Sequence, residues 1–294
     1  MTLPRHSVTR NSARVLWRYA TTLAARLSEP VRSPLRARAL ARCAGATEAP
    51  SSNADPVTVL MVYRAKNRAL VELLVRSLGG NADIRLWALD EVAPELAPYT
   101  LGSGPGMRFT HLNWLYRERA VREDSWVVIS DDDFYFAKGS LRRTIELMAR
   151  AGLSLAQPSQ SLLGWWTDAF SMPRPLVVAR DTNCVEQGPV VIADAAFASL
   201  MFPLPDVADM AWGIEAEWYR LKENRFRTGV IDECRVVHVG RVASSYEVAP
   251  QMRAMRERLS KSGIDSIWQL RTVNGYWWRW QRSPSWMGVQ RVGA

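Results

Sequence analysis

The sequence has few cysteines and no apolar run long enough to cross a membrane. Its three cysteines, Cys43, Cys184 and Cys234, are odd in number and far apart, so they predict neither a disulfide framework nor a paired metal motif. A reducing compartment is the simplest inference. The N-terminus also lacks the uninterrupted apolar segment of a signal peptide. We therefore expect a cytoplasmic protein.

Lysine is scarce as well, because 34 of the 38 basic residues are arginine. This bias runs through the whole chain, which argues against a transit peptide at the arginine-rich N-terminus, although targeting stays open as an alternative. The formal net charge is +9, but residues 1–56 alone contribute +6 of it. Most of the excess charge thus lies outside any groove that would follow a phosphate backbone, and we expect no nucleic-acid partner.

Composition divides the chain into three parts. Residues 1–56 form a basic extension that ends in a linker-like stretch, residues 57–245 carry an α/β pattern, and residues 246–294 form a helical, tryptophan-rich tail. Leucines at helical spacing predict a basic helix over residues 12–27. This helix either packs on the domain or lies on an anionic membrane surface, which would place the protein peripherally at the inner face of the membrane. Core packing is the default role of the tail tryptophans, and a sugar-facing or interfacial surface is the alternative.

Predicted strands and helices alternate in the middle part. The continuous apolar run at 57–63 predicts a strand buried on both faces, and residues 83–90 and 126–130 predict two more. A helix is predicted after the first strand, with Gly79 as its C-cap, and another over residues 110–122. Ser140 and Gly152 are expected to bound a third helix. This pattern indicates an α/β fold, in which ligands bind at the C-terminal ends of strands.

Three consecutive aspartates, Asp131, Asp132 and Asp133, follow the strand at 126–130. Strand side chains alternate in direction, so Asp131 and Asp133 are expected to point one way and Asp132 the other. Like charges beside a buried strand need compensation, and two converging carboxylates suit a hard divalent cation, either Mn²⁺ or Mg²⁺. A solvated turn is the alternative, because aspartate also favours turns.

Two later segments bear on the same site. MAWGIEAEWYRL contains Glu215 and Glu217 after a Trp-Gly pair, and about twenty residues later His238 lies inside the apolar run ECRVVHVGR. A lone histidine in an apolar strand is more often a core residue than a metal ligand. It becomes a ligand candidate only when a carboxylate pair can complete the site.

The aspartate triplet, WGIEAEWYRL and VVHVG, in this order, resemble the GT-A fold glycosyltransferases, and in particular metal-dependent inverting enzymes such as galactosyltransferases. The resemblance covers residues 57–245 and implies a Rossmann-type mixed sheet flanked by helices. It also implies that Asp131 and Asp133 form an Asp-x-Asp element that holds the cation against the donor's diphosphate, with His238 completing the site. Glu215 matches the acid that follows Trp-Gly-x, which in such enzymes contacts the acceptor or serves as the base, and we favour Glu215 as the base. Ala216 stands where a further acid is usual, so Glu217 remains an alternative base.

Substrate contacts can also be assigned as expectations. The donor is expected to be a nucleotide-diphosphate sugar, most simply a UDP-sugar, bound by Tyr63, Arg64, Asp90, Arg108 and Asp132. Ordinary strand-end polarity is the alternative explanation of these residues. The acceptor, a cell-surface polysaccharide or another glycan or lipid-linked acceptor, is expected at Trp165, Trp166, Glu186 and Trp212. Adjacent tryptophans cannot both face one way in regular structure, so one of Trp165 and Trp166 is expected in the core.

Two other functions remain open. A sugar-phosphate nucleotidyltransferase would be expected to show a glycine- and lysine-rich phosphate loop after its first strand, whereas this chain has Val62-Tyr63-Arg64-Ala65-Lys66. A non-catalytic carbohydrate-binding protein with a degenerate transferase fold is the second alternative, and Ala216 keeps it open. The transferase hypothesis predicts inversion, because no second carboxylate is identifiable as a nucleophile.

Overall fold

The computed structural model describes residues 29–45, 55–166, 168–205, 207, 210–222, 226–241 and 247–286. The helix predicted over residues 12–27, and with it the predicted membrane contact, lies outside the described residues. No helix within these ranges is both long and apolar enough to span a bilayer.

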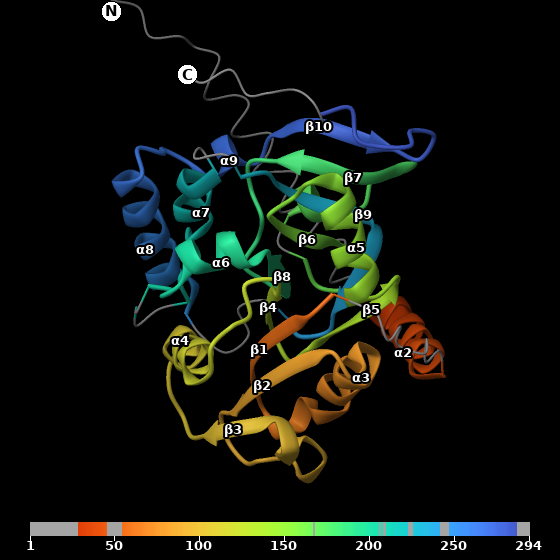
Figure 1. Cartoon of the computed structure of the whole chain (residues 1–294), viewed down its shortest axis with the longest axis vertical. Coiled ribbons are helices and arrows are strands. Elements are labelled where there is room, and N and C mark those ends of the chain that lie inside the picture. The colour runs from red at the N-terminus through yellow and green to blue at the C-terminus, as the bar shows by residue number, and fades with distance from the viewer. Residues whose placement is uncertain are drawn as a thin grey trace, which may run out of the picture.

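A mixed sheet of ten strands runs through the described chain (Figure 1). The strands are β1 Val57–Tyr63, β2 Ala82–Ala88, β3 Thr100–Ser103, β4 Trp126–Ser130, β5 Phe134–Lys138, β6 Leu155–Gln160, β7 Val177–Thr182, β8 Val190–Ala193, β9 Thr228–His238 and β10 Val273–Trp278. Their order is β10-β7-β9-β6-β8-β4-β1-β2-β3, and β5 pairs with β9 off this path. β1 is parallel to both β2 and β4, whereas β8 is antiparallel to β4 and β6.

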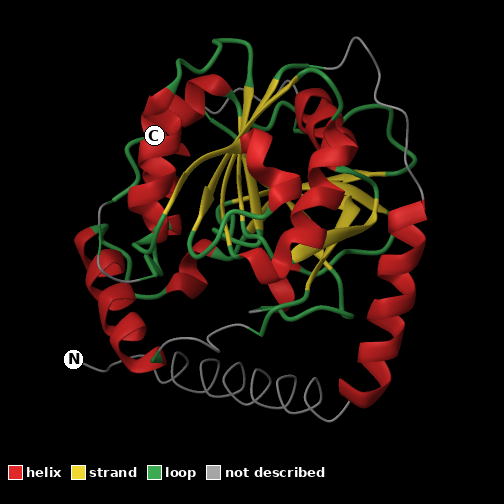
Figure 2. Cartoon of the chain, turned by 90° about the horizontal axis from the view of Figure 1, so that it is seen from below, coloured by secondary structure: helices red, strands yellow, loops and turns green. Residues whose placement is uncertain are grey.

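Helices cover both faces of the sheet (Figures 1 and 2). They are α2 Glu29–Gly45, α3 Arg68–Leu78, α4 Arg108–Glu118, α5 Leu141–Ala151, α6 Ala195–Met201, α7 Glu215–Lys222, α8 Val248–Lys261 and α9 Ile267–Leu270. In Figure 1, α3 and α5 lie on one side of the sheet and α4, α6 and α7 on the other. The predicted α/β fold class is therefore confirmed.

β1 is a strand whose side chains are buried on both faces of the sheet. All seven of its residues are buried. Val57, Val59 and Met61 pack into a core shared with α3 and α5, whereas Leu60 and Val62 pack into a second core shared with α4 and α6. Side chains of a strand alternate between the two faces, so a continuous apolar run is what a sheet between two helical layers requires.

The predicted helix boundaries follow local chemistry. The Ser140 hydroxyl caps α5 by accepting a hydrogen bond from the Arg143 amide at 3.1 Å, and Gly152 ends the helix with φ 62°. Gly79 ends α3 with φ 71°. These positive φ values favour glycine, which has no Cβ to clash. The helix predicted at 110–122 is observed as α4 over residues 108–118, so it is displaced towards the N-terminus.

Segments from the two ends of the chain also contact the sheet. α2 lies beside β5, where the Tyr135 hydroxyl donates to the Arg36 carbonyl at 3.0 Å. β10, from the tryptophan-rich tail, pairs with β7 and buries Trp277. Trp280 just beyond it is 68% exposed. The division of the chain at residues 57 and 245 stays a prediction.

Buried charges tie β7 to β9. Arg180 on β7 and Asp232 on β9 form an ion pair with 2.8 Å between Nε and Oδ2, and both side chains are completely buried. The Arg180 guanidinium also donates to the carbonyls of Phe170 and Met172. Charges removed from water must be paired and hydrogen-bonded, and this cluster satisfies both requirements.

Candidate active site

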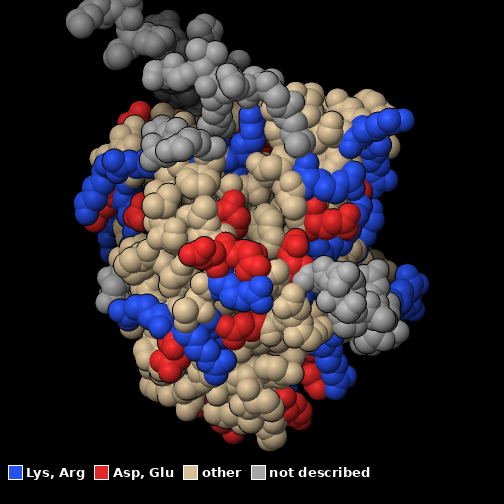
Figure 3. Space-filling model, in the orientation of Figure 1, with Lys and Arg blue, Asp and Glu red and all other residues tan. Residues whose placement is uncertain are grey.

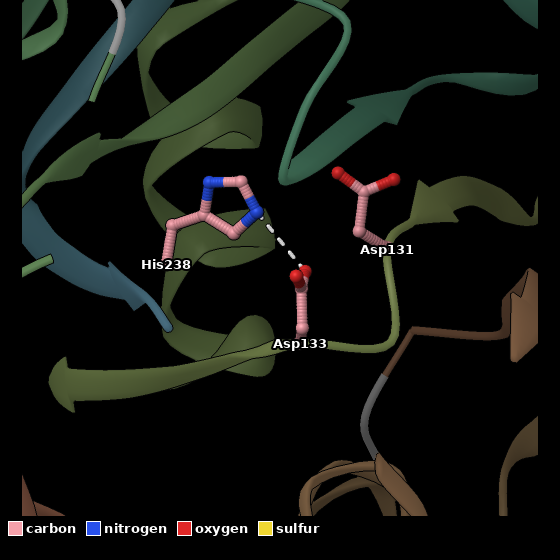
Figure 4. A group of neighbouring side chains, drawn as sticks. All are labelled: Asp131, Asp133 and His238. Carbon is pink, nitrogen blue, oxygen red and sulfur yellow. Dashed lines mark ion pairs between the residues drawn. The ribbon is translucent and has the colours of Figure 1, made fainter. Parts of the chain in front are cut away.

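Asp131, Asp133 and His238 lie together at one edge of the sheet (Figure 4). Each can offer one ligand atom, and these atoms all lie within 4.8 Å of one another. Asp133 and His238 point towards each other, with 3.0 Å between Oδ1 and Nε2. This is the only such group of three metal-binding side chains in the described part of the chain.

The strands bring these residues together. Asp131 follows the end of β4, Asp133 precedes β5, and His238 ends β9. β5 and β9 are antiparallel, with Phe134 opposite His238. Asp132 points to the other side, where its Oδ2 accepts the Arg64 amide at 2.7 Å. The expected directions of the three side chains are therefore observed, although residues 131–133 lie between β4 and β5 and not within a strand.

The electrostatics of the three groups are coupled. Burial raises the pKa of Asp131, and the Arg108 charge opposes that rise. Burial would also raise the pKa of Asp133, but the hydrogen bond and charge of His238 hold it below its usual value. His238 has a raised pKa, because the two aspartates outweigh the effect of its burial.

The residues present fit a divalent cation. Two carboxylates and an imidazole are oxygen and nitrogen donors that Mn²⁺ accepts readily. Two glycines make room for the carboxylates: a Cβ at Gly188 would lie 2.7 Å from Asp131 Oδ2, and a Cβ at Gly240 would collide with the Asp133 carboxylate. The carboxylates therefore lie in a cradle that longer side chains would fill.

Three of the residues expected to bind the donor lie at strand or helix ends: Arg108, Arg64 and Asp90. Arg108, at the start of α4, forms an ion pair with Asp131, with 2.8 Å between Nη2 and Oδ1. Arg64 and Asp90 are both exposed at strand ends, and Asp90 accepts the backbone amides of Ala65 and Glu91. The space-filling view shows acidic side chains gathered over the region of β4 and β8, with basic side chains directly below them (Figure 3).

Tyr63 lies apart from the other donor candidates. Its side chain is completely buried, and its hydroxyl lies 3.1 Å from the Thr100 hydroxyl and accepts the Ala93 amide. The donor contact expected of Tyr63 needs an accessible side chain, and this side chain is buried. The alternation of β1 accounts for the difference, because it turns Tyr63 towards the same core as Met61.

Glu215 and Glu217 both lie in the first turn of α7. Burial raises the pKa of Glu215, although its carboxylate accepts the Gly213 amide at 3.1 Å. The pKa of Glu217 is also raised by burial, and the charges of Arg258 and Arg220 oppose that rise. The two glutamates thus have different surroundings, and only Glu215 faces the charged cluster around Glu186.

That cluster contains residues that sequence reasoning missed. Arg271, which follows α9, pairs with Asp168 at 2.5 Å and lies 3.5 Å from Glu186. Gln160 donates from Nε2 to Glu186 Oε2 at 2.9 Å. Burial raises the pKa of Glu186 to about 7, with the Arg271 charge opposing the rise. No local pattern marks Arg271, because its partners are far away in the sequence.

Gln160 links this cluster to the metal-binding group. Its Nε2 also lies 3.3 Å from the Gly188 carbonyl, and Gly188 packs against Asp131. The Glu186 Oε1 atom and the Gln157 side-chain nitrogen are buried without a hydrogen-bond partner among the described residues. Buried polar atoms of this kind are usually satisfied by water or by a ligand.

The acceptor candidates Trp165 and Trp166 are both half-buried, so neither belongs fully to the core. Two guanidinium groups lie near the centre of the Trp165 ring, that of Arg32 at 5.8 Å and that of Arg241 at 5.9 Å. The Trp165 amide donates to the His238 carbonyl at 2.8 Å, which places this loop beside the metal-binding group. Trp212 is half-buried, and its carbonyl accepts a hydrogen bond from Arg258.

Solved structures provide the comparison with known proteins. The chain is similar to GalNAc-T7 in a crystal structure with UDP, GalNAc and Mn²⁺, with a TM-score of 0.50 and 10% sequence identity, over 71% of this chain and 48% of that one. The chain has a GT-A fold. It spans about half the length of the GalNAc-T7 chain. The mixed sheet and the Asp131–Asp133 pair at a strand end agree with this fold.

Two further structures are similar to this GT-A chain at lower scores. The mannosyltransferase PcManGT from Pyrobaculum calidifontis, in complex with GDP-Man and Mn²⁺, gives a TM-score of 0.49 at 13% identity, over 83% of this chain and 75% of that one. S. aureus TarS 1-349, in complex with UDP-GlcNAc, gives 0.49 at 14% identity, over 70% and 65%. No protein-family model and no curated protein sequence matches the chain.

Proposed function

We propose that the protein is a metal-dependent glycosyltransferase that moves a sugar from a nucleotide-diphosphate sugar to a glycan or lipid-linked acceptor. One observation carries this proposal: Asp131, Asp133 and His238 gather their ligand atoms within 4.8 Å at strand ends of a GT-A fold. The similarity to a structure with UDP and Mn²⁺ supports a UDP-sugar donor and a Mn²⁺ or Mg²⁺ site.

The three ligand residues would hold the cation, which would supply positive charge opposite the donor's diphosphate. Arg108 lies 2.8 Å from Asp131 and brings a further positive charge to the same place. Asp132 accepts the Arg64 amide and Asp90 accepts the Ala65 amide at the end of β1, and the exposed Arg64 and Asp90 side chains are proposed to contact the nucleotide. Fixed charges that oppose a developing anion stabilise the transition state without reorganisation.

Glu215 is the proposed base. It would accept the proton of the acceptor hydroxyl while that oxygen bonds to the anomeric carbon and the bond to the diphosphate breaks, with its electron pair leaving on the phosphate. Burial raises the pKa of Glu215, which makes its carboxylate a stronger base. A single base and a single displacement lead to inversion. Glu186, Trp165, Trp166 and Trp212 are proposed to contact the acceptor.

Calorimetric titration of UDP and GDP, with and without Mn²⁺, tests the donor site. We expect one nucleotide to bind wild type only with metal, and D131N/D133N to lose that binding. The matched control is D124N, because Asp124 is an exposed aspartate in an ion pair with Arg122. The metal-site proposal fails if D131N/D133N keeps metal-dependent binding, or if wild type binds no nucleotide. In either case the aspartates would form a solvated turn, as the alternative from the sequence holds.

A further inference from the structure

The loop at residues 161–166 lies between α2 and the end of β9. Its Ser161 amide donates to a carbonyl of β9 at 2.8 Å, and its Trp165 amide donates to the His238 carbonyl at the same distance. Gly164 packs directly on this ligand residue, because a Cβ at Gly164 would lie 2.6 Å from the His238 backbone nitrogen. The loop is therefore attached at two points to the strand that carries His238, and a shift of the loop would move that residue.

Two arginines of α2 hold the same loop from its other side. The buried Arg32 guanidinium donates to the Gly164 carbonyl, and Arg36 Nη1 donates to the Leu163 carbonyl at 3.1 Å. Glu29 fixes Arg36 in turn, since its Oε2 accepts from the same Nη1 atom at 3.1 Å. Hydrogen bonds from a charged donor are stronger than those between neutral groups, so these two contacts are a firm attachment.

α2 is itself anchored on β5, beside which it lies in Figure 1. The Tyr135 hydroxyl donates to the Arg36 carbonyl at 3.0 Å, and the Cys43 thiol donates to the Phe136 carbonyl at 3.0 Å. β5 pairs with β9 in the ladder that brings the metal-binding side chains together. The helix, the loop and the metal-binding group are thus connected to one another through a single pair of strands.

We propose that Arg32 and Arg36 are positioning residues for the metal site: by holding the loop against His238, they keep its imidazole beside the Asp133 carboxylate. This inference rests on the proposed function, because it concerns the same metal-binding side chains. Groups that orient metal ligands typically change metal affinity by about 10-fold to 100-fold when they are removed. The basic extension therefore contributes to the active site through α2, although it lies far from that site in the sequence.

The direction of the effect separates positioning from electrostatics. Arg32 and Arg36 carry positive charge towards the loop beside a cation site, so their removal should tighten Mn²⁺ binding if charge alone matters. Release of the loop predicts the opposite, a weaker binding of Mn²⁺. Arg38 and Arg42 allow a matched comparison, because both are exposed on the same helix and neither forms an ion pair with another described residue.

The test uses the full chain and two readouts. Titration of Mn²⁺ alone, followed by the EPR signal of the free ion, gives the Kd for the metal without donor. Hydrogen exchange in EDTA, followed by mass spectrometry, measures how firmly residues 161–166 and 238–240 are held, and it needs no metal. The second segment includes the Val239 amide, which donates to the Asp133 carbonyl at 2.8 Å.

Two variants disturb the contact from opposite sides. R32Q/R36Q removes the attachment to α2, and R38Q/R42Q is its control because it removes the same charge from the exposed face of that helix. G164A pushes the loop away from His238 and leaves α2 unchanged, so it answers the same question if R32Q/R36Q does not fold. Its control is G80A, because nothing lies within 4 Å of a Cβ at that position.

We expect R32Q/R36Q and G164A to raise the Kd for Mn²⁺ by about tenfold and to exchange the amides of both segments at least tenfold faster than wild type. The two controls should stay within about twofold of wild type in both readouts.

Three results would overturn the inference and leave the metal site intact. The Kd of R32Q/R36Q could fall, as charge alone predicts, or its exchange could equal that of R38Q/R42Q. An unchanged Kd in G164A or in R32Q/R36Q, even with a lower melting temperature, would give the contact a purely structural role. If wild type binds no Mn²⁺, the proposed metal site and this inference both fail.

Discussion

Arg271 Nη2 lies 3.5 Å from Glu186 Oε1, so a residue from the C-terminal part of the chain contacts the loop that precedes β8. The same guanidinium pairs with Asp168. It also lowers the pKa of Glu215 below the value that burial alone would give. Arg271 thus contacts two carboxylates, Asp168 and Glu186, and its charge also acts on a third, Glu215, which is the proposed base.

The pH dependence of activity should report this relationship. The pKa of Glu215 is raised, so its base form is complete at higher pH and is lost as the pH falls through that pKa. R271Q removes an opposing positive charge, so the acidic fall of kcat/KM should begin at a higher pH than in wild type. Glu186 and Cys184 also face Glu215 and remain in the variant.

R271K is the control for this experiment, because it keeps the charge and loses only the planar guanidinium. Its acidic limb should lie close to that of wild type, even if KM changes. A purely structural role for Arg271 predicts instead that both variants lower kcat/KM at every pH and that neither moves the acidic limb.

Gly188 should be sensitive to the smallest substitution. In G188A the new Cβ would lie 2.7 Å from Asp131 Oδ2, so the carboxylate must shift and the ligand atoms must move apart. We expect the Kd for Mn²⁺-dependent nucleotide binding to rise by about 10-fold to 100-fold, as when groups that orient metal ligands are changed. G80A is the matched control, because nothing lies within 4 Å of a Cβ at that position. If G188A and G80A bind the nucleotide with equal Kd in the presence of Mn²⁺, the absence of a side chain at Gly188 is not needed for the Asp131 carboxylate to hold the metal.

Replacement of Glu215 should separate binding from chemistry. E215Q keeps the side chain's size and its acceptance of the Gly213 amide, but it cannot take a proton. We expect donor binding within about twofold of wild type and a fall in kcat of about 10² to 10⁴, measured as sugar transfer under saturating donor. E217Q should retain most of its activity. The reverse order of the two variants would assign the base to Glu217.

Loss of the buried ion pair between Arg180 on β7 and Asp232 on β9 should strongly lower the free energy of unfolding. D232A leaves the Arg180 guanidinium buried without its anion, and we expect a loss of about 3–5 kcal/mol in the free energy of unfolding by urea. D124A removes an exposed ion pair and should change the midpoint little. A D232A midpoint close to that of D124A would mean that water reaches Arg180.

Local signals allowed much of the fold to be predicted from the sequence. The strand at 57–63 and the ends of α5 are set by apolar runs and by Ser140 and Gly152, which act on their nearest neighbours. Asp131 and Asp133 also lie on one side as expected, although they stand between β4 and β5 and not within one strand. Periodicity further contained the signal that Tyr63 belongs to the core, because Tyr63 shares a strand face with Met61.

The rest depended on contacts between distant segments. Arg271 meets Glu186 through tertiary packing of α9, and no spacing within either segment predicts that meeting. The contact of Arg32 with Trp165 likewise joins the basic extension to a loop more than a hundred residues later. Charged residues are frequent in any chain, so only the three-dimensional arrangement distinguishes these arginines from the others.

The pairing of β5 with β9 has a consequence for how the protein folds and how it can be assayed. Asp133 and His238 come from the two halves of the chain and meet only when this ladder has formed. A ligand that requires both side chains can therefore bind only the folded protein, and the stabilisation of that state rises with the logarithm of the ligand concentration once this exceeds Kd. A rise in melting temperature with added Mn²⁺ would thus show that Asp133 and His238 have been brought together by the β5–β9 pairing. This measurement needs no substrate.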